Sequence, residues 1–136
     1  MKMMMVHLNY WAILVAAIVN MVIGAIYYSP FVFGGLYAKL TGRKLTEMKM
    51  KGYEFTVQFV VSLIMVYVLA HFLSYAGAVD WQAGAIGGFW VWLGFIATTS
   101  IAGFLWEGKS FKYYLLSNGE FLLMMLVSGA ILGMWR

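Results

Sequence analysis

The chain has no cysteine, one proline and two histidines among its 136 residues. Without cysteine it has no disulfide, thiolate nucleophile or thiolate metal site, and the redox compartment cannot be inferred. His7 and His71 alone do not make a credible metal site, because a metal centre needs further ligands. We therefore expect no metal and no other cofactor. His71 is expected to hydrogen-bond a nearby tyrosine or a lipid headgroup.

Charge is also scarce, since 10% of the residues are charged and 64% are hydrophobic, against about 25% charged in typical soluble domains. The mean hydropathy is +0.86, and a water-soluble chain of this length could not bury so much apolar surface. Each apolar stretch is long enough to cross a bilayer as a helix, which takes about 20 residues. The sequence predicts an all-α, polytopic membrane bundle of four transmembrane helices, forming a single integral membrane domain over residues 1–136. The predicted spans are 8–28, 55–76, 83–106 and 113–135.

The only proline begins the longest connection between spans. Ser29 and Pro30 suit an N-cap and a first helical position, and Gly42 suits a C-terminal stop. These residues predict a short helix over Pro30–Leu40, whose apolar side chains favour the membrane surface. Either it anchors the end of the first span at the interface, or it is a re-entrant segment that lines a pathway.

Basic residues gather in two of the gaps between spans. By the positive-inside rule, the sequence predicts a multi-pass protein of the cell membrane with both termini outside and the basic loops in the cytoplasm. The net charge of +4 does not indicate nucleic acid, because lipid headgroups beside the spans account for the basic residues. The expected contacts with anionic lipid are Lys39, Arg43, Lys44, Lys49 and Lys51, and the second basic gap holds Lys109 and Lys112.

Small residues recur on one face of three spans, which lets helix backbones approach closely in a membrane. The pattern therefore predicts tight helix packing, either within the chain or with another copy. We expect a homo-oligomer, because four short helices enclose little beyond their own packing. The three strips are Ala12, Ala16, Asn20 and Gly24; Gly84, Gly87, Gly88, Gly94, Thr98 and Ala102; and Gly129 and Gly133.

Polar side chains within the spans fall at similar depths, roughly 8–13 Å below the inner surface at about 1.5 Å per residue. They predict one polar layer in the inner half of the bundle, which either binds a ligand or fixes helix register by hydrogen bonds. Glu120 is its only ionisable member, and it binds a cation or proton, makes a structural hydrogen bond, or lies accessible near the inner surface. The candidate binding residues are Asn20, Thr98, Asn118 and Glu120, and Ser62, Thr99 and Ser100 complete the layer.

The sequence contains no catalytic triad order, no paired catalytic carboxylates, no P-loop and no dinucleotide-binding glycine pattern. We therefore expect no enzyme and assign no catalytic residue. Two functions remain open: a small channel or transporter-like protein with the polar layer as its site, or a non-transport membrane adaptor or structural subunit that binds a partner or lipid.

The element Tyr28-Ser29-Pro30-x-x-x-Gly34, together with Asn118-Gly119 and the pair Gly129 and Gly133, resembles an uncharacterised prokaryotic family of small four-helix membrane proteins. This family is classed only as a domain of unknown function. The resemblance covers nearly the whole chain and implies the four-span fold, without an established activity. It also implies a neutral residue near position 120, so that Glu120 departs from the family pattern.

Overall fold

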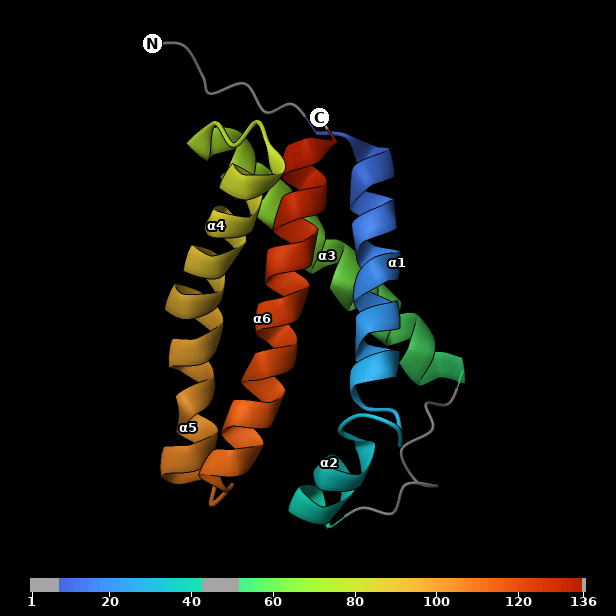
Figure 1. Ribbon diagram of the computed structural model, residues 1–136, viewed down its shortest axis with the longest axis vertical. Coiled ribbons are helices and arrows are strands. Elements are labelled where there is room, and N and C mark those ends of the chain that lie inside the picture. Colours follow the sequence, from blue (N-terminus) through green and yellow to red (C-terminus); the bar gives the residue numbers. More distant parts are fainter. Residues whose placement is uncertain (1–7, 43–51, 136) are drawn as a thin grey trace.

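The computed structural model describes residues 8–42 and 52–135 (Figure 1). The π-helix η2 joins α4 to α5, and the three form one continuous helix over Trp81–Trp106. The described residues contain no strand. The elements are α1 (Tyr10–Tyr27), α2 (Gly34–Thr41), α3 (Gly52–Ala76), α4 (Trp81–Val91), η2 (Trp92–Ala97), α5 (Thr98–Trp106) and α6 (Phe111–Met134).

Four of these helices are long and apolar enough to cross a membrane: α1, α3, the continuous α4–η2–α5 helix, and α6. Every predicted span end lies within three residues of a helix end. The predicted fold class, an all-α bundle with four membrane-compatible helices, is therefore confirmed.

Helix α6 lies between α1 and the α4–α5 helix, and α3 crosses behind them at a steep angle (Figure 1). α1 begins and α6 ends at one end of the bundle. The short helix α2 lies at the opposite end, near the connection between α5 and α6. This arrangement places the predicted inner half beside α2. The membrane side that each end faces stays a prediction.

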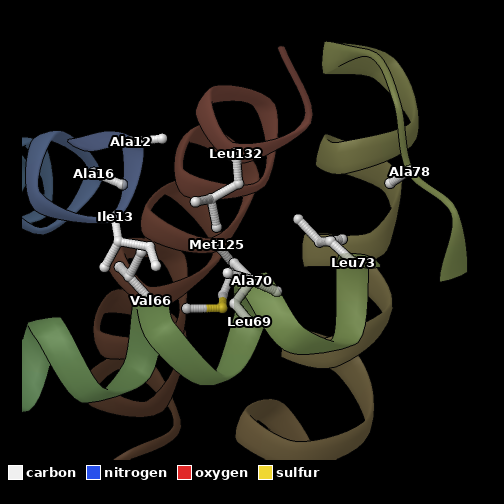
Figure 2. Close-up of a cluster of buried hydrophobic side chains, with 10 residues drawn as sticks. All are labelled: Ala12, Ile13, Ala16, Val66, Leu69, Ala70, Leu73, Ala78, Met125 and Leu132. Atoms are coloured by element: carbon white, nitrogen blue, oxygen red, sulfur yellow. The ribbon is translucent and has the colours of Figure 1, made fainter. Parts of the chain in front are cut away.

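The apolar core forms where α3 crosses α1 and α6 (Figure 2). Val66 and Leu69 of α3 pack with Ile13 of α1 and Met125 of α6, while Leu73 of α3 lies toward α4. Many other large apolar side chains, including Ile64 and Trp90, are exposed. Such a surface is compatible with contact to lipid tails.

Helices α4 and α6 pack backbone against backbone through glycines. A Cβ atom added at Gly84 would collide with the carbonyl group of Gly129, and one added at Gly129 would collide with that of Gly84. Gly88 and Gly133 make equally close approaches to the facing backbone. The sequence left open whether these strips face the same chain or another copy, and these glycines face each other within one chain.

The second half of the strip predicted on span three is wrong. A π turn holds about one residue more than an α turn, so η2 rotates all later residues by about 100° around the helix axis. Gly84 and Gly88 consequently face α6, whereas Gly94 and Thr98 are exposed. Ala97 and Ser100 make the contact with α6 instead. The Ala97 carbonyl accepts from the Tyr114 hydroxyl at 2.7 Å, and the Ser100 hydroxyl donates to Asn118 Oδ1 at 2.9 Å.

The short helix after the first span exists, but it begins at Gly34 rather than at Pro30. Ser29 does not cap it, because the Ser29 hydroxyl donates backwards to the Ile26 carbonyl at 2.7 Å and so ends α1. Gly42 ends α2 with a φ of 72°, in the left-handed region that favours glycine. The apolar side chains of Phe31, Val32 and Phe33 therefore belong to the turn before α2.

Gly34 closes this turn by a close backbone approach. Its amide donates to the Ser29 carbonyl at 2.8 Å, and an added Cβ atom would lie 2.6 Å from the Tyr28 carbonyl oxygen. The glycine of the Tyr-Ser-Pro-x-x-x-Gly element is thus required because no side chain fits between the two backbone segments.

Gly34→Ala is expected to lower the free energy of unfolding by about 1–2 kcal/mol, because the turn must open to admit a methyl group. The neighbouring Gly35→Ala is a matched control, since a Cβ atom there meets nothing within 4 Å. Thermal unfolding in detergent, followed by circular dichroism, measures both. Equal midpoints for the two variants would contradict the steric role of Gly34.

Candidate functional site

Glu120 lies on α6 at its interface with α1, and only 9% of its surface is exposed. A Cβ atom added at Gly24 of α1 would lie 3.2 Å from Glu120 Oε1, so the absence of a side chain at Gly24 leaves room for the carboxyl group. The Tyr28 hydroxyl interacts with this carboxyl group. In residues 8–42 and 52–135 no lysine, arginine or histidine forms an ion pair with Glu120. The carboxyl group is therefore buried beside a hydroxyl, and no cationic side chain of the described residues pairs with it.

The end of α1 is fixed on α6 beside this carboxyl group. The Tyr27 hydroxyl donates to the Leu116 carbonyl at 2.6 Å. It fits because residue 119 is glycine, where an added Cβ atom would lie 2.8 Å from the Tyr27 oxygen. The Tyr28 ring packs on Tyr37 of α2, with 4.7 Å between ring centroids. The turn closed by Gly34 therefore holds Tyr28 against both α2 and Glu120.

Asn20 also lies on the interface between α1 and α6, one helical turn from Gly24, and is 1% exposed. Its Oδ1 accepts a hydrogen bond from the Ser128 hydroxyl at 2.8 Å. Its Nδ2 is fully buried and has no hydrogen-bond partner, the one such side-chain atom in the part of the chain that the structure describes. An unsatisfied buried donor is costly, and native proteins usually satisfy it with water or a ligand. Ser62 of α3 makes a separate contact with α1, to the Ala17 carbonyl at 3.3 Å.

Asn118 belongs to a different face of α6. Its Oδ1 accepts from Ser100 at 2.9 Å, and its Nδ2 donates to the Tyr114 carbonyl at 3.0 Å. The Trp92 indole donates to the Asn118 backbone carbonyl, also at 3.0 Å. Two residues along a helix correspond to about 200° of rotation, so Asn118 and Glu120 face opposite neighbours. The predicted single polar layer is thus divided by α6 into one group against α1 and one against η2 and α5.

Thr98 joins neither group. It is exposed, and its hydroxyl donates to the Gly94 carbonyl of the preceding turn at 2.6 Å. Thr99 is also exposed and bonds the Phe95 carbonyl in the same way. The rotation introduced by η2 explains both positions. Of the four candidate binding residues, only Asn20 and Glu120 share an interface.

Sequence reasoning did not place Tyr27 and Tyr28 among the candidate site residues and therefore missed their contacts with α6. The available signal was the adjacent Ser29-Pro30 break, which turns the chain back toward the bundle. It likewise left Ser128 out of the polar layer. The partner that it missed was Asn20, because a single helix pattern does not give the register of the facing helix.

His71 lies apart from these groups, on α3. Its ring nitrogen Nδ1 bonds the Tyr67 carbonyl at 3.0 Å, and its ring makes edge contacts with Tyr67 and Tyr75. The expected tyrosine partner is therefore Tyr67, bonded through its backbone. Among the described residues, no three histidine, aspartate or glutamate side chains gather as metal ligands would. His7 and the predicted lipid contacts Arg43, Lys44, Lys49 and Lys51 lie outside the described residues.

Residues 11–133 match the model of the family described as "Protein of unknown function (DUF1761)". Because the match covers most of the chain, the protein belongs to this family. The predicted membership of an uncharacterised family is confirmed. Neither the comparison with curated proteins nor the comparison with solved structures gives a match.

Proposed function

We propose that this member of a family without an assigned activity is a small transport protein that moves a cation or proton through its bundle, with Glu120 as the binding group. The observation that carries the proposal is the burial of the Glu120 carboxyl group between two apolar helices, without a cationic partner among the described residues. A carboxylate inside a membrane domain is expensive to maintain unless a proton or a cation neutralises it. A site that carries a proton or cation must bind it and release it reversibly, and such a carboxyl group can do both.

The surroundings of Glu120 support the same function. Tyr28 provides a hydroxyl that can hold the carboxyl group in either protonation state. One turn farther into the bundle, Asn20 presents a buried amide nitrogen that lacks a partner. A water molecule between these groups would accept from Asn20 and donate toward Glu120. The α1–α6 interface thus offers polar groups at successive depths, as a transport pathway needs.

The proposal narrows the predicted set of binding residues. Asn118 uses its side-chain oxygen and nitrogen within the bundle, and Thr98 faces away from Glu120. We therefore assign binding to Glu120, with Asn20 and Tyr28 as neighbours. In this proposal the α2 end faces the cytoplasm, in keeping with the positive-inside rule. Assembly into a homo-oligomer remains part of the proposal, and no catalytic step is assigned.

A second candidate, a non-transport adaptor or structural subunit, is favoured by the hydrogen bonds around Asn118. The contacts of Asn118 with Ser100 and Trp92 fix α6 against η2 and α5. In this alternative, Glu120 and Tyr28 would likewise serve only to join α6 to the end of α1.

Glu120→Gln is expected to abolish cation or proton flux into liposomes that contain the purified protein, because an amide neither releases a proton nor neutralises a cation. Flux is followed with pH-sensitive and cation-sensitive dyes after a gradient is imposed. Glu54→Gln is the matched control, since it makes the same chemical change at the beginning of α3 and should leave flux unchanged. Wild-type flux equal to that of empty liposomes across common ions would exclude the transport function.

A further inference from the structure

A cleft of about 230 Å³ opens between α5 and α6, beside the connection that joins them. Glu120 does not line this cleft. Gly103 lines the cleft, and an added Cβ atom there would meet Lys109 Cδ at 3.5 Å and Glu107 Oε2 at 3.6 Å. The lining residues used below are Gly103, Glu107, Lys109, Tyr113 and Ser117.

Two opposite charges stand at this cleft. Lys109 Nζ lies 3.6 Å from Glu107 Oε2, and both side chains are more than half exposed. Lys109 Nζ also lies 5.3 Å from the centre of the Tyr113 ring. An exposed ion pair contributes little to stability, so exchanging it for contacts with a ligand costs little. The cleft therefore suits a ligand that itself carries a negative and a positive group close together.

Hydroxyl groups in the cleft are available to the same ligand. The side chains of Ser117 and Tyr113 form no side-chain hydrogen bond within the described chain, although neighbouring hydroxyls such as that of Thr99 are bonded to their own helix. A phosphate group accepts hydrogen bonds from hydroxyls and from lysine. The missing side chain at Gly103 leaves the space in which such a group fits.

The cleft also lies at the depth of lipid headgroups, because it sits where two membrane-compatible helices end and begin. Phe104, which lines the cleft, and the adjoining Leu105 and Trp106 are exposed and apolar, which favours acyl chains beside a polar headgroup. A soluble phosphate ester would use the charges but not this apolar border.

We propose that the cleft between α5 and α6 binds the headgroup of a zwitterionic aminophospholipid. Lys109 contacts the phosphate, together with the hydroxyls of Ser117 and Tyr113, and Glu107 accepts hydrogen bonds from the primary ammonium group. This site does not depend on the transport function proposed for Glu120.

The test is native mass spectrometry of the protein released from nanodiscs with equal amounts of phosphatidylethanolamine, phosphatidylcholine and phosphatidylglycerol. Wild type should retain phosphatidylethanolamine about threefold over each of the others, as expected for exposed charged contacts. Glu107→Gln should remove the preference over phosphatidylglycerol, Lys109→Ala should lower retention of all three lipids, and Gly103→Leu should fill the cleft and remove retention.

Lys112→Ala is the matched control, because Lys112 is exposed in the same region and does not line the cleft. Unchanged retention in Lys112→Ala supports the site, whereas a loss as large as in Lys109→Ala would show diffuse charge attraction and overturn it. Thermal unfolding of each variant establishes that it is folded, and Glu107→Gln keeps the test valid if Gly103→Leu unfolds. Displacement of the bound lipid by millimolar glycerophosphoethanolamine would reassign the cleft to a soluble phosphate ester and overturn the lipid assignment.

Discussion

Gly129→Ala should lower the free energy of unfolding by about 3 kcal/mol, because the new methyl group has no space between α4 and α6. An added Cβ atom would lie 2.8 Å from the Gly84 carbonyl carbon and closer still to its oxygen. Both atoms belong to a helix backbone, so a side-chain rotation cannot relieve the collision. The two helices must separate, and their close contacts are the main attraction between helices in lipid. Denaturation with sodium dodecyl sulfate, followed by circular dichroism, measures the loss.

Gly94→Ala is the control for this prediction. It makes the same substitution within the α4–η2–α5 helix, but a Cβ atom at Gly94 meets nothing within 4 Å. We expect its stability to equal or slightly exceed that of wild type, since alanine favours a helix more than glycine does. If Gly129→Ala were as stable as Gly94→Ala, α4 and α6 would not pack as closely as the structure shows.

The spans were predictable because their length and apolarity are local properties of the sequence. The glycine contacts between α4 and α6 were partly predictable, since G-x-x-x-G spacing indicates close packing. The identity of the facing helix was not, because spacing on one helix carries no information about its partner. Gly94 and Thr98 were misplaced for another reason. The prediction assumed 100° per residue throughout, and no sequence pattern indicated the extra residue in η2.

The candidate site, like the fold, could be predicted from the sequence only in part. The depth of Glu120 followed from counting residues along α6, and its burial is what an intramembrane carboxylate requires. The neighbours of Glu120 could not be predicted from such a count. Tyr28 reaches Glu120 only because Gly34 closes the turn after α1, and that closure depends on two backbone segments in contact. Asn118 was grouped with Glu120 by depth alone, although their directions around α6 separate them.

Glu120→Met should raise the free energy of unfolding by about 1–3 kcal/mol while it abolishes flux. An ionisable residue near the centre of a membrane helix costs about 2.5–3.5 kcal/mol for insertion, and the contact with Tyr28 offsets part of that cost. Methionine is unbranched and flexible, so it can occupy the space beside Gly24 without a polar group. Removing a binding group that is maintained at the expense of stability should therefore stabilise the fold, and the same denaturation assay measures the gain.

Asn118→Leu, on the same helix, is expected to change stability in the opposite direction to Glu120→Met. The Asn118 side chain bonds Ser100 and the Tyr114 carbonyl, and leucine removes both hydrogen bonds, each worth about 0.5–1.5 kcal/mol. Asn118→Leu should thus lower stability. If Glu120→Met were destabilised as strongly as Asn118→Leu, Glu120 would join the helices as Asn118 does, and the adaptor function would be favoured. A gain in stability for Glu120→Met and a loss for Asn118→Leu, at positions only two residues apart, would instead distinguish a group kept for binding from one kept for packing.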